Sequence, residues 1–290
     1  MENRQTGILL LRIFLGLALL KDFITYFSNR QFLFDKNGIV SYETYQDIIN
    51  YYDLQWLNID FTQPNNSVFF CLLGIFFSLT FTLGILSRTS AFFLFFLSFI
   101  FKFRNIFLLD GGDNIVMVLL PFFFFIQSTS LCATYNAFLE KWRIKNNYYL
   151  DTLHKLAILG IMIQVCYIYL FAGLHKLQGE VWQDGTALYY ILNSSDFAAY
   201  SLDTLFVQFP FLVYLLTWCT IAFQLTFPFL VWCKKTRKIV LYLGILLHLG
   251  ILVLMRIDNF SFIMLACYTV FFTDKEYDAL QLKTNLKLKL

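Results

Sequence analysis

The sequence predicts an all-α, polytopic membrane protein, a bundle of about eight helices with a polar cavity that faces the extracytoplasmic side. Of its 290 residues, 59% are hydrophobic and only 14% are charged, whereas soluble domains carry about a quarter charged residues. The mean hydropathy is +0.64. Apolar stretches recur along the whole chain, and no hydrophilic block is long enough for a separate soluble domain. We therefore expect a single transmembrane domain over residues 1–290.

Each predicted helix is a stretch that approaches the roughly 20 apolar residues of a membrane span. The first, 7–27, contains Arg12, Lys21 and Asp22 and lacks the cleavage site of a signal peptide, so we interpret it as a retained span. The others cover 67–86, 90–108, 113–127, 154–174, 209–233, 237–256 and 259–273. The fourth and eighth are short, so six or seven crossings are the alternative to eight.

The positions of lysine and arginine predict the topology, because cytoplasmic loops carry an excess of both. The segment "CKKTRK" (233–238) is the strongest marker, and with eight spans both termini are cytoplasmic too. The opposite side then receives two acidic outer loops, near 28–66 and 174–208. We expect a multi-pass protein of the cell membrane, with lipid as a partner.

Two classes of function find no support in the composition. The net charge is only +3 and the phenylalanines lie within the apolar stretches, which argues against a nucleic-acid partner. The six cysteines are scattered, with no spacing typical of a metal site. We expect no bound metal.

Polar residues at the ends of the predicted helices converge on the extracytoplasmic side. Ionisable groups at membrane depth are costly and usually face a cavity or a partner. The candidates are Asp110, Asp113, Asn114, His175, Lys176 and Arg256. Asp113 is a natural N-cap for the helix that follows it, whereas Asp110 has no such structural reason.

Lys176 follows an apolar helix and has two interpretations. Its side chain snorkels to the lipid head groups, or it is a partly desolvated amine that acts as a base. His175 shares a pocket with it only if the helix ends or bends there, since neighbouring helical residues point about 100 degrees apart.

His248 lies in the middle of an apolar helix. It is either a core histidine bonded to a neighbouring helix or a cavity-lining group. Arg256 follows eight residues later on roughly the same helical face, where an interfacial ion pair with Asp258 is the plainer interpretation.

Together these features resemble the horizontally transferred transmembrane (HTTM) domain family, which includes vitamin K-dependent gamma-carboxylase, and in it the short bacterial members of the sporulation-delaying protein B group. The most specific element is "YLFAGLHKLQGEVWQDGTALYY" (169–190), similar to the family's A-G-x-x-K-L and W-x-x-G signature; we refer to it as the signature segment. Supporting elements are "FRNIFLLDGGDN", "LLHLGI" and "FDKNGIV" (34–40), the last a predicted turn. The resemblance covers most of the chain.

The resemblance implies a membrane quinol as cofactor, with Lys176 as the base and His248 as the polar partner of the quinol oxygen. It assigns substrate binding to the other candidates, and it implies maturation of a secreted peptide toxin with a small partner protein. Where the carboxylase branch has an active-site histidine, this chain has Asp113 and Asn114. We also expect no counterpart of the large soluble domain of that branch. We therefore do not expect carboxylation.

Three classes of function stay open. The first is an enzyme or enzyme subunit that modifies a secreted peptide through quinol-linked base chemistry. The second is a non-catalytic membrane scaffold or export partner for such a peptide. The third, a transporter, usually shows related halves, and this sequence has no internal repeat.

Overall fold

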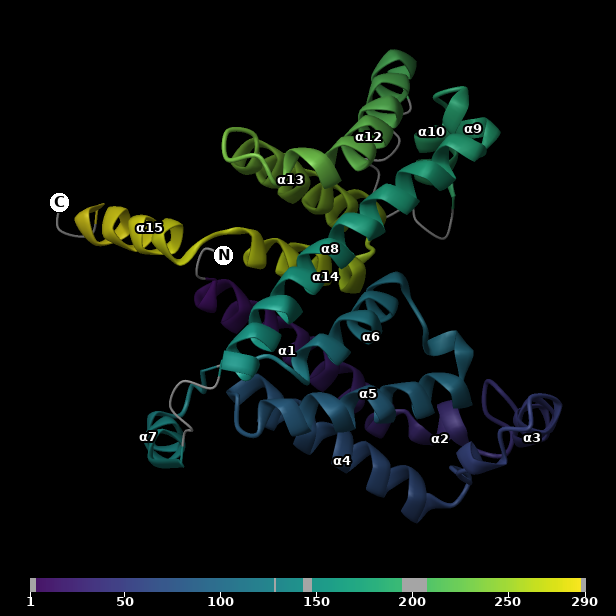
Figure 1. Ribbon diagram of the computed structural model, residues 1–290. Coiled ribbons are helices and arrows are strands. Elements are labelled where there is room, and N and C mark those ends of the chain that lie inside the picture. Colours follow the sequence, from purple (N-terminus) through teal and green to yellow (C-terminus); the bar gives the residue numbers. More distant parts are fainter. Residues whose placement is uncertain (1–3, 128, 143–147, 195–207, 288–290) are drawn as a thin grey trace. The chain divides into compact units, whose positions relative to one another are not determined.

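The computed structural model describes residues 4–127, 129–142, 148–194 and 208–287 (Figure 1). Every regular element in these ranges is helical, which confirms the predicted fold class. The chain divides into two compact units, Met1–Ile158 and Leu159–Leu290, and each is described by itself. Residues 195–207 of the second predicted outer loop lie outside the described residues.

The first unit is built from long apolar helices and a short outer segment. Its helices are α1 (Gln5–Ser28), α2 (Arg30–Phe34), α3 (Tyr42–Tyr51), η1 (Gln55–Leu57), α4 (Pro64–Leu83), α5 (Ser87–Arg104), η2 (Ile106–Leu108), α6 (Gly111–Phe123), α7 (Ala133–Trp142) and the start of α8 (Tyr148–Gln178). Within the unit α1 packs against α4, α4 against α5 and α5 against α6.

Glycines allow α1 and α4 to approach closely. A Cβ atom at Gly16 would collide with Thr82, and one at Gly74 would collide with the ring of Phe23. Small residues serve this purpose in membrane helices, where close backbone packing replaces the hydrophobic driving force.

Arg104, at the end of α5, holds the outer segment in place. Its side chain is fully buried and donates hydrogen bonds to the carbonyls of Val40 (2.9 Å) and Phe34 (3.2 Å). These carbonyls belong to the two ends of the "FDKNGIV" segment, whose predicted turn is formed, since the Gly38 N–H donates to the Asp35 carbonyl. Two of the elements that support the family resemblance therefore contact each other through one guanidinium.

The second unit contains the rest of α8 and the helices that follow it. These are α9 (Glu180–Gln183), α10 (Ala187–Asn193), α12 (Pro210–Leu230), α13 (Arg237–Met255), α14 (Asp258–Tyr268), η3 (Thr269–Phe271) and α15 (Asp274–Lys287). Here α12 packs against α10 and α13, and α13 packs against α14.

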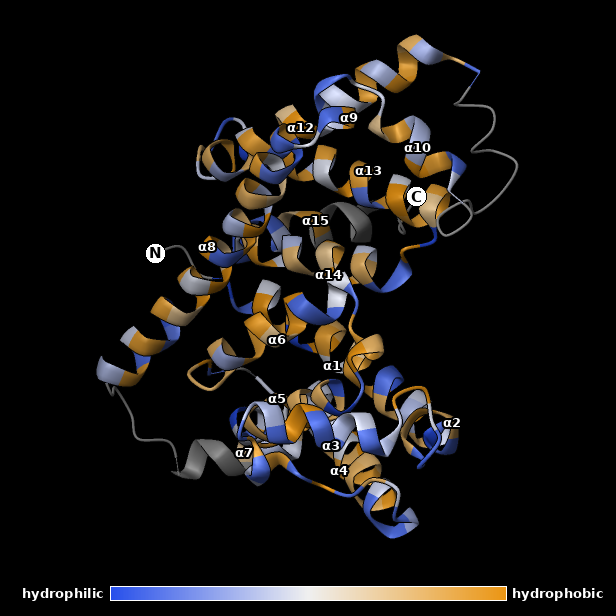
Figure 2. Cartoon of the chain, turned by 90° about the vertical axis from the view of Figure 1, so that its right-hand side faces the viewer, coloured by the Kyte–Doolittle hydropathy of each residue, from blue (hydrophilic) through white to orange (hydrophobic). Residues whose placement is uncertain are grey.

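The positions of the helices agree with the prediction, because each of the eight predicted windows overlaps a helix. Four described helices, α4, α8, α12 and α13, are long and apolar enough to cross a membrane, and two apolar helices, Gly111–Phe123 and Asp258–Phe271, are shorter. Hydrophobic residues predominate along α12 and α13 (Figure 2), and large ones such as Phe211 and Leu246 are 78% and 67% exposed, as lipid contact requires. The number of crossings stays a prediction.

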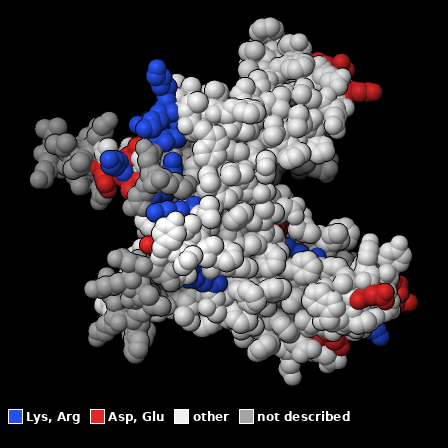
Figure 3. Space-filling view, in the orientation of Figure 1, with Lys and Arg blue, Asp and Glu red and all other residues white. Residues whose placement is uncertain are grey.

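Basic and acidic side chains are unevenly distributed in the second unit. Basic side chains gather at the turn between α12 and α13, next to the acidic start of α15, whereas the charged side chains at α9 and the turn that follows it are acidic (Figure 3). This distribution is what the predicted topology requires of this unit, and the side of the membrane that each end faces stays a prediction.

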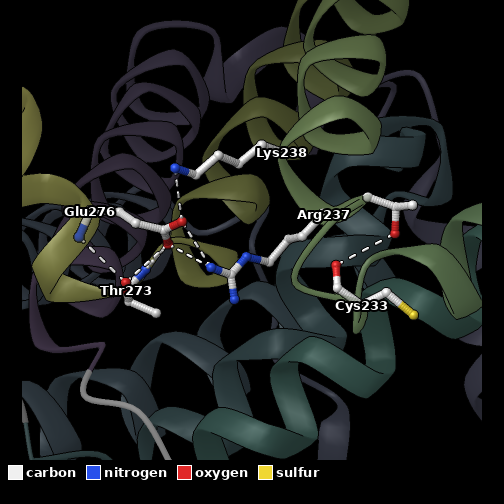
Figure 4. A network of polar contacts seen from close by, with 6 residues as sticks. Cys233, Arg237, Lys238, Thr273 and Glu276 are labelled. Carbon is white, nitrogen blue, oxygen red and sulfur yellow. Dashed lines mark hydrogen bonds and ion pairs between the residues drawn. The ribbon is translucent and has the colours of Figure 1, made fainter.

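A polar network lies at the basic end of this unit and joins α13 to the start of α15 (Figure 4). The Arg237 guanidinium donates to both carboxylate oxygens of Glu276 at 2.8 Å, and the Lys238 ammonium lies 3.5 Å from the same group. Thr273 donates to this carboxylate from its N–H (2.9 Å) and its hydroxyl (3.0 Å). The Glu276 N–H donates to the Thr273 hydroxyl in return (3.4 Å), which makes a capping box at the start of α15.

Glu276 makes the stability of this end dependent on pH. Burial by itself would raise its pKa, but the hydrogen bonds from Thr273 and Arg237 outweigh burial and lower the pKa from 4.5 to about 2. A carboxyl group with a lowered pKa stabilises the fold above its unfolded pKa and loses that effect as the pH falls. We expect the thermal unfolding midpoint (Tm) of the detergent-solubilised protein to decrease as the pH is lowered from about 4.5 to about 2. In Glu276→Gln this part of the pH dependence should be missing, and an unchanged profile would contradict the prediction.

Candidate functional site

The predicted site residues are divided between the two units. Asp110, Asp113 and Asn114 belong to the first, and His175, Lys176, His248 and Arg256 belong to the second. The geometry of each group is therefore given within its own unit, and the convergence of the two groups stays a prediction.

The two aspartates at the start of α6 have roles that differ from those the sequence suggested. Asp110, not Asp113, is the N-cap, and its carboxylate accepts from the Asp113 N–H at 2.7 Å. Asp113 is the third helical residue, and its carboxylate accepts from the Asp110 N–H at 3.4 Å in return. The acidic capping box explains why both positions are acidic. Asp110 and Asn114 are exposed, whereas Asp113 is buried.

Asp113 has a further partner that the sequence analysis missed. Its carboxylate lies 3.1 Å from the Lys102 ammonium of α5, and both side chains are only 5% exposed. Asp22 of α1 lies close enough to both to interact electrostatically, and it also pairs with Lys21 at 3.3 Å. Three helices of the first unit therefore bring a buried lysine and two carboxylates together.

The signature segment forms a corner at the end of α8. The Lys176 ammonium lies over the Trp182 ring of α9, 4.8 Å from its centre, a distance at which cation and ring attract each other. Gly173 faces Leu225 and Gln224 of α12, and a Cβ there would come within 2.8 Å of Leu225. Gly185 has a positive φ of 71°, and a Cβ there would collide with Tyr214. The two glycines and the tryptophan of the segment thus each have a structural role.

His175 and Lys176 lie on different sides of α8. The helix continues to Gln178, so the ending that would bring both side chains into one pocket does not occur at these residues. Lys176 is half-buried, whereas His175 is exposed. Within the described part of the chain, no shared pocket holds this pair.

His248 is part of a buried polar network. Its Nε2 atom lies 2.7 Å from the Tyr169 hydroxyl of α8, and that hydroxyl is also hydrogen-bonded to the Tyr268 hydroxyl of α14. The sequence predicted a role for His248 but for neither tyrosine. Tyr169 is the first residue of the signature segment, and this position could have identified it as a site residue.

Tyr169, Gly173 and Lys176 share one face of α8, because they are four and three residues apart. A helix rises about 1.5 Å per residue, so Lys176 lies about 10 Å along the axis from the tyrosine that contacts His248. The Cβ atom of Gln224 lies next to Gly173, and the side-chain oxygen of Gln224 is buried and lacks a hydrogen-bond partner among the described residues. This face of α8 therefore carries Lys176 and the close packing contact at Gly173 in one row, and the facing helix α12 contributes the unsatisfied Gln224 oxygen.

Arg256 does not continue the helical face of His248. It follows the last helical residue, Met255, and has a positive φ of 51°, so the eight-residue helical spacing does not reach it. Its side chain is exposed. Among the described residues no group of three or more His, Cys, Asp or Glu side chains is placed to hold a metal ion.

Comparison with known proteins gives three findings. The model of the HTTM domain family matches residues 3–275. The chain is 30% identical over 172 residues to the Sporulation-delaying protein SdpB of Bacillus subtilis (strain 168), an alignment that covers 56% of this chain and 51% of the relative. The match thus spans about half the length of that relative. No solved structure matches the chain.

Proposed function

The chain belongs to the HTTM domain family, and from this membership we propose that it is a multi-pass membrane protein that acts in the maturation or modification of a secreted peptide. The similarity to the Sporulation-delaying protein SdpB supports this proposal. The resemblance of the signature segment to that group supports it as well. A secreted peptide precursor and a small partner protein are the proposed partners.

The observation that carries an enzymatic role is the placement of Lys176. Lys176 lies in the last turn of the apolar helix α8 and its side chain is half-buried. Its amine lies over the Trp182 ring, so its position is defined by packing. An amine in such surroundings is partly withdrawn from water, which suits a group that takes up a proton. We propose that Lys176 in its neutral form accepts the hydroxyl proton of a membrane quinol and becomes an ammonium over the tryptophan ring.

The residues of the second unit fit a quinol. His248 lies on the helix that faces Tyr169, and Gln224, whose Cβ packs beside Gly173, has a buried oxygen without a hydrogen-bond partner among the described residues. His248 can hydrogen-bond to an oxygen of a ring that enters from the lipid, and the Gln224 oxygen can accept from a quinol hydroxyl. A bound quinol would supply the deprotonated oxygen on which the peptide chemistry depends. The proposed substrate-binding residues are Asp110, Asp113, Asn114, His175 and Arg256.

A second candidate function is a scaffold or export partner for the peptide. The contact between Lys176 and Trp182 favours the charged amine, since the ring attracts a cation. A permanently charged Lys176 binds an anionic group of a peptide but takes up no proton.

Two measurements test the function. Mass spectrometry of secreted peptides, from cells with and without the protein, should show at least one peptide whose mass depends on it. In membrane vesicles that contain the protein and the precursor, a reduced short-chain naphthoquinone should raise the yield of mature peptide. Vesicles without the protein are the control. An unchanged yield favours the scaffold, and identical secreted peptides in both cell lines would rule out both functions.

A further inference from the structure

The side chains of two tyrosines and one histidine form an isolated polar network in the second unit. Tyr169, His248 and Tyr268 are 2%, 2% and 1% exposed. The rings of Phe227 and Phe260 border the network. The Nδ1 atom of His248 is buried, and no described residue forms a hydrogen bond with it. The network therefore ends at a nitrogen atom that has no hydrogen-bond partner among the described residues.

Gly244 makes room for this arrangement. It lies one turn before His248 on α13, and a Cβ atom there would collide with the Tyr268 hydroxyl. The tyrosine of α14 thus reaches the Tyr169 hydroxyl because α13 carries no side chain at that point.

The available protons decide which nitrogen of His248 carries hydrogen. When all three side chains are neutral, the network holds three such protons: one on each hydroxyl and one on the imidazole ring. A charged imidazolium is disfavoured in these aromatic surroundings, because burying an uncompensated charge is costly. The three protons can then point along the network in either of two directions. In a third arrangement Tyr169 accepts from both neighbours, which leaves its own O–H and the Nδ1 lone pair unsatisfied.

In the first arrangement Tyr268 donates to Tyr169, and Tyr169 donates to Nε2 of His248. Only the Nδ1–H group is then unsatisfied. In the second, Nε2–H donates to Tyr169 and Tyr169 donates to Tyr268, which leaves two groups unsatisfied, the Tyr268 O–H and the Nδ1 lone pair. An unsatisfied buried group costs about 1–3 kcal/mol. The first arrangement is therefore the most stable.

We propose that the Tyr268–Tyr169 pair holds His248 as its Nδ1–H tautomer, and that this N–H is the hydrogen-bond donor for a ring oxygen of a membrane quinone or quinol. The tautomer follows from the network alone, whereas the ligand class deepens the proposed function and rests on it. His248 acts as a donor to oxygen and not as the proton acceptor, which leaves that role to Lys176. Tyr169 and Tyr268 are positioning residues.

Nitrogen-15 NMR of the histidine-labelled full-length protein in lipid tests the tautomer without a ligand. The chain has three histidines, so the His248 signals are those that disappear in His248→Gln. The expected spectrum has a protonated Nδ1 and an unprotonated Nε2. Tyr268→Phe should keep this pattern because Tyr169 can still donate, whereas Tyr169→Phe should mix the two tautomers. A protonated Nε2 in the wild type would overturn the proposal.

The ligand class is tested in the same sample. A short-chain naphthoquinone should shift the Nδ1 resonance of the wild type, and it should shift no His248 signal in a matched sample that receives the alkyl chain without the ring. If the Nδ1–H tautomer is found but the resonance does not move, a quinone ligand is excluded while the tautomer stands. The peptide measurements described above fail or succeed independently of the ligand-free spectrum, so the two proposals can be told apart.

Discussion

Replacing Lys176 by alanine is expected to lower peptide maturation by about 100-fold or more, the usual contribution of a positioned acid or base. The variant also loses the cation that lies over Trp182. Maturation is measured as the ratio of mature to precursor peptide by mass spectrometry, at equal amounts of membrane-inserted protein. That normalisation separates a chemical effect from reduced expression.

Arginine at position 176 distinguishes a base from a bound cation. Lys176→Arg keeps the positive charge and can still stack on Trp182, but a guanidinium does not lose its proton in proteins. If Lys176 is the base, the arginine variant is as inactive as the alanine variant. If Lys176 only binds an anionic group, the arginine variant keeps most of the activity, and the scaffold function is favoured.

The matched control is Lys155→Ala. Lys155 lies on the same helix, α8, and its side chain is exposed, so this variant removes a lysine charge without touching the corner at Trp182. Lys102 would be a poor control because it is buried in an ion pair with Asp113. Equal losses in Lys155→Ala and Lys176→Ala would contradict a specific role for Lys176.

The helices could be predicted from the sequence because each apolar stretch is a local property of about 20 residues. The side-chain partners could not, because they join residues far apart in the chain. Arg104 pairs with carbonyls 64 and 70 residues away, and Tyr169 meets His248 79 residues later. The residues next to Arg104 and Tyr169 in the sequence do not indicate such partners.

The assignment of Asp110 shows a different kind of error. A cap was expected at Asp113 from its position next to the apolar run, but α6 begins two residues earlier, at Gly111. The helix starts there because Asp110 and Asp113 satisfy each other's backbone N–H groups. The spacing of the two acids, three residues apart, was the signal for this capping box.

Burial of the Lys102–Asp113 pair predicts a second large effect, on stability. Removing one partner leaves the other charge buried, which costs about 3–5 kcal/mol. We expect Lys102→Met and Asp113→Asn each to lower the free energy of unfolding by this amount in reversible denaturation of the protein in mixed micelles. Asparagine is chosen because its side-chain oxygen can still accept from the Asp110 N–H, so the capping box is kept.

The double variant Lys102→Met, Asp113→Asn should be more stable than the sum of the two single effects predicts, because it leaves neither charge without its counterpart. Lys21→Met is the control: Lys21 also pairs with an aspartate, Asp22, but its side chain is 58% exposed, and such pairs contribute only about 0–1 kcal/mol. Simple additivity of the two single variants would show that the buried lysine and Asp113 do not stabilise each other. Asp22, which interacts electrostatically with both groups, would then be the carboxylate that keeps Lys102 charged inside the first unit.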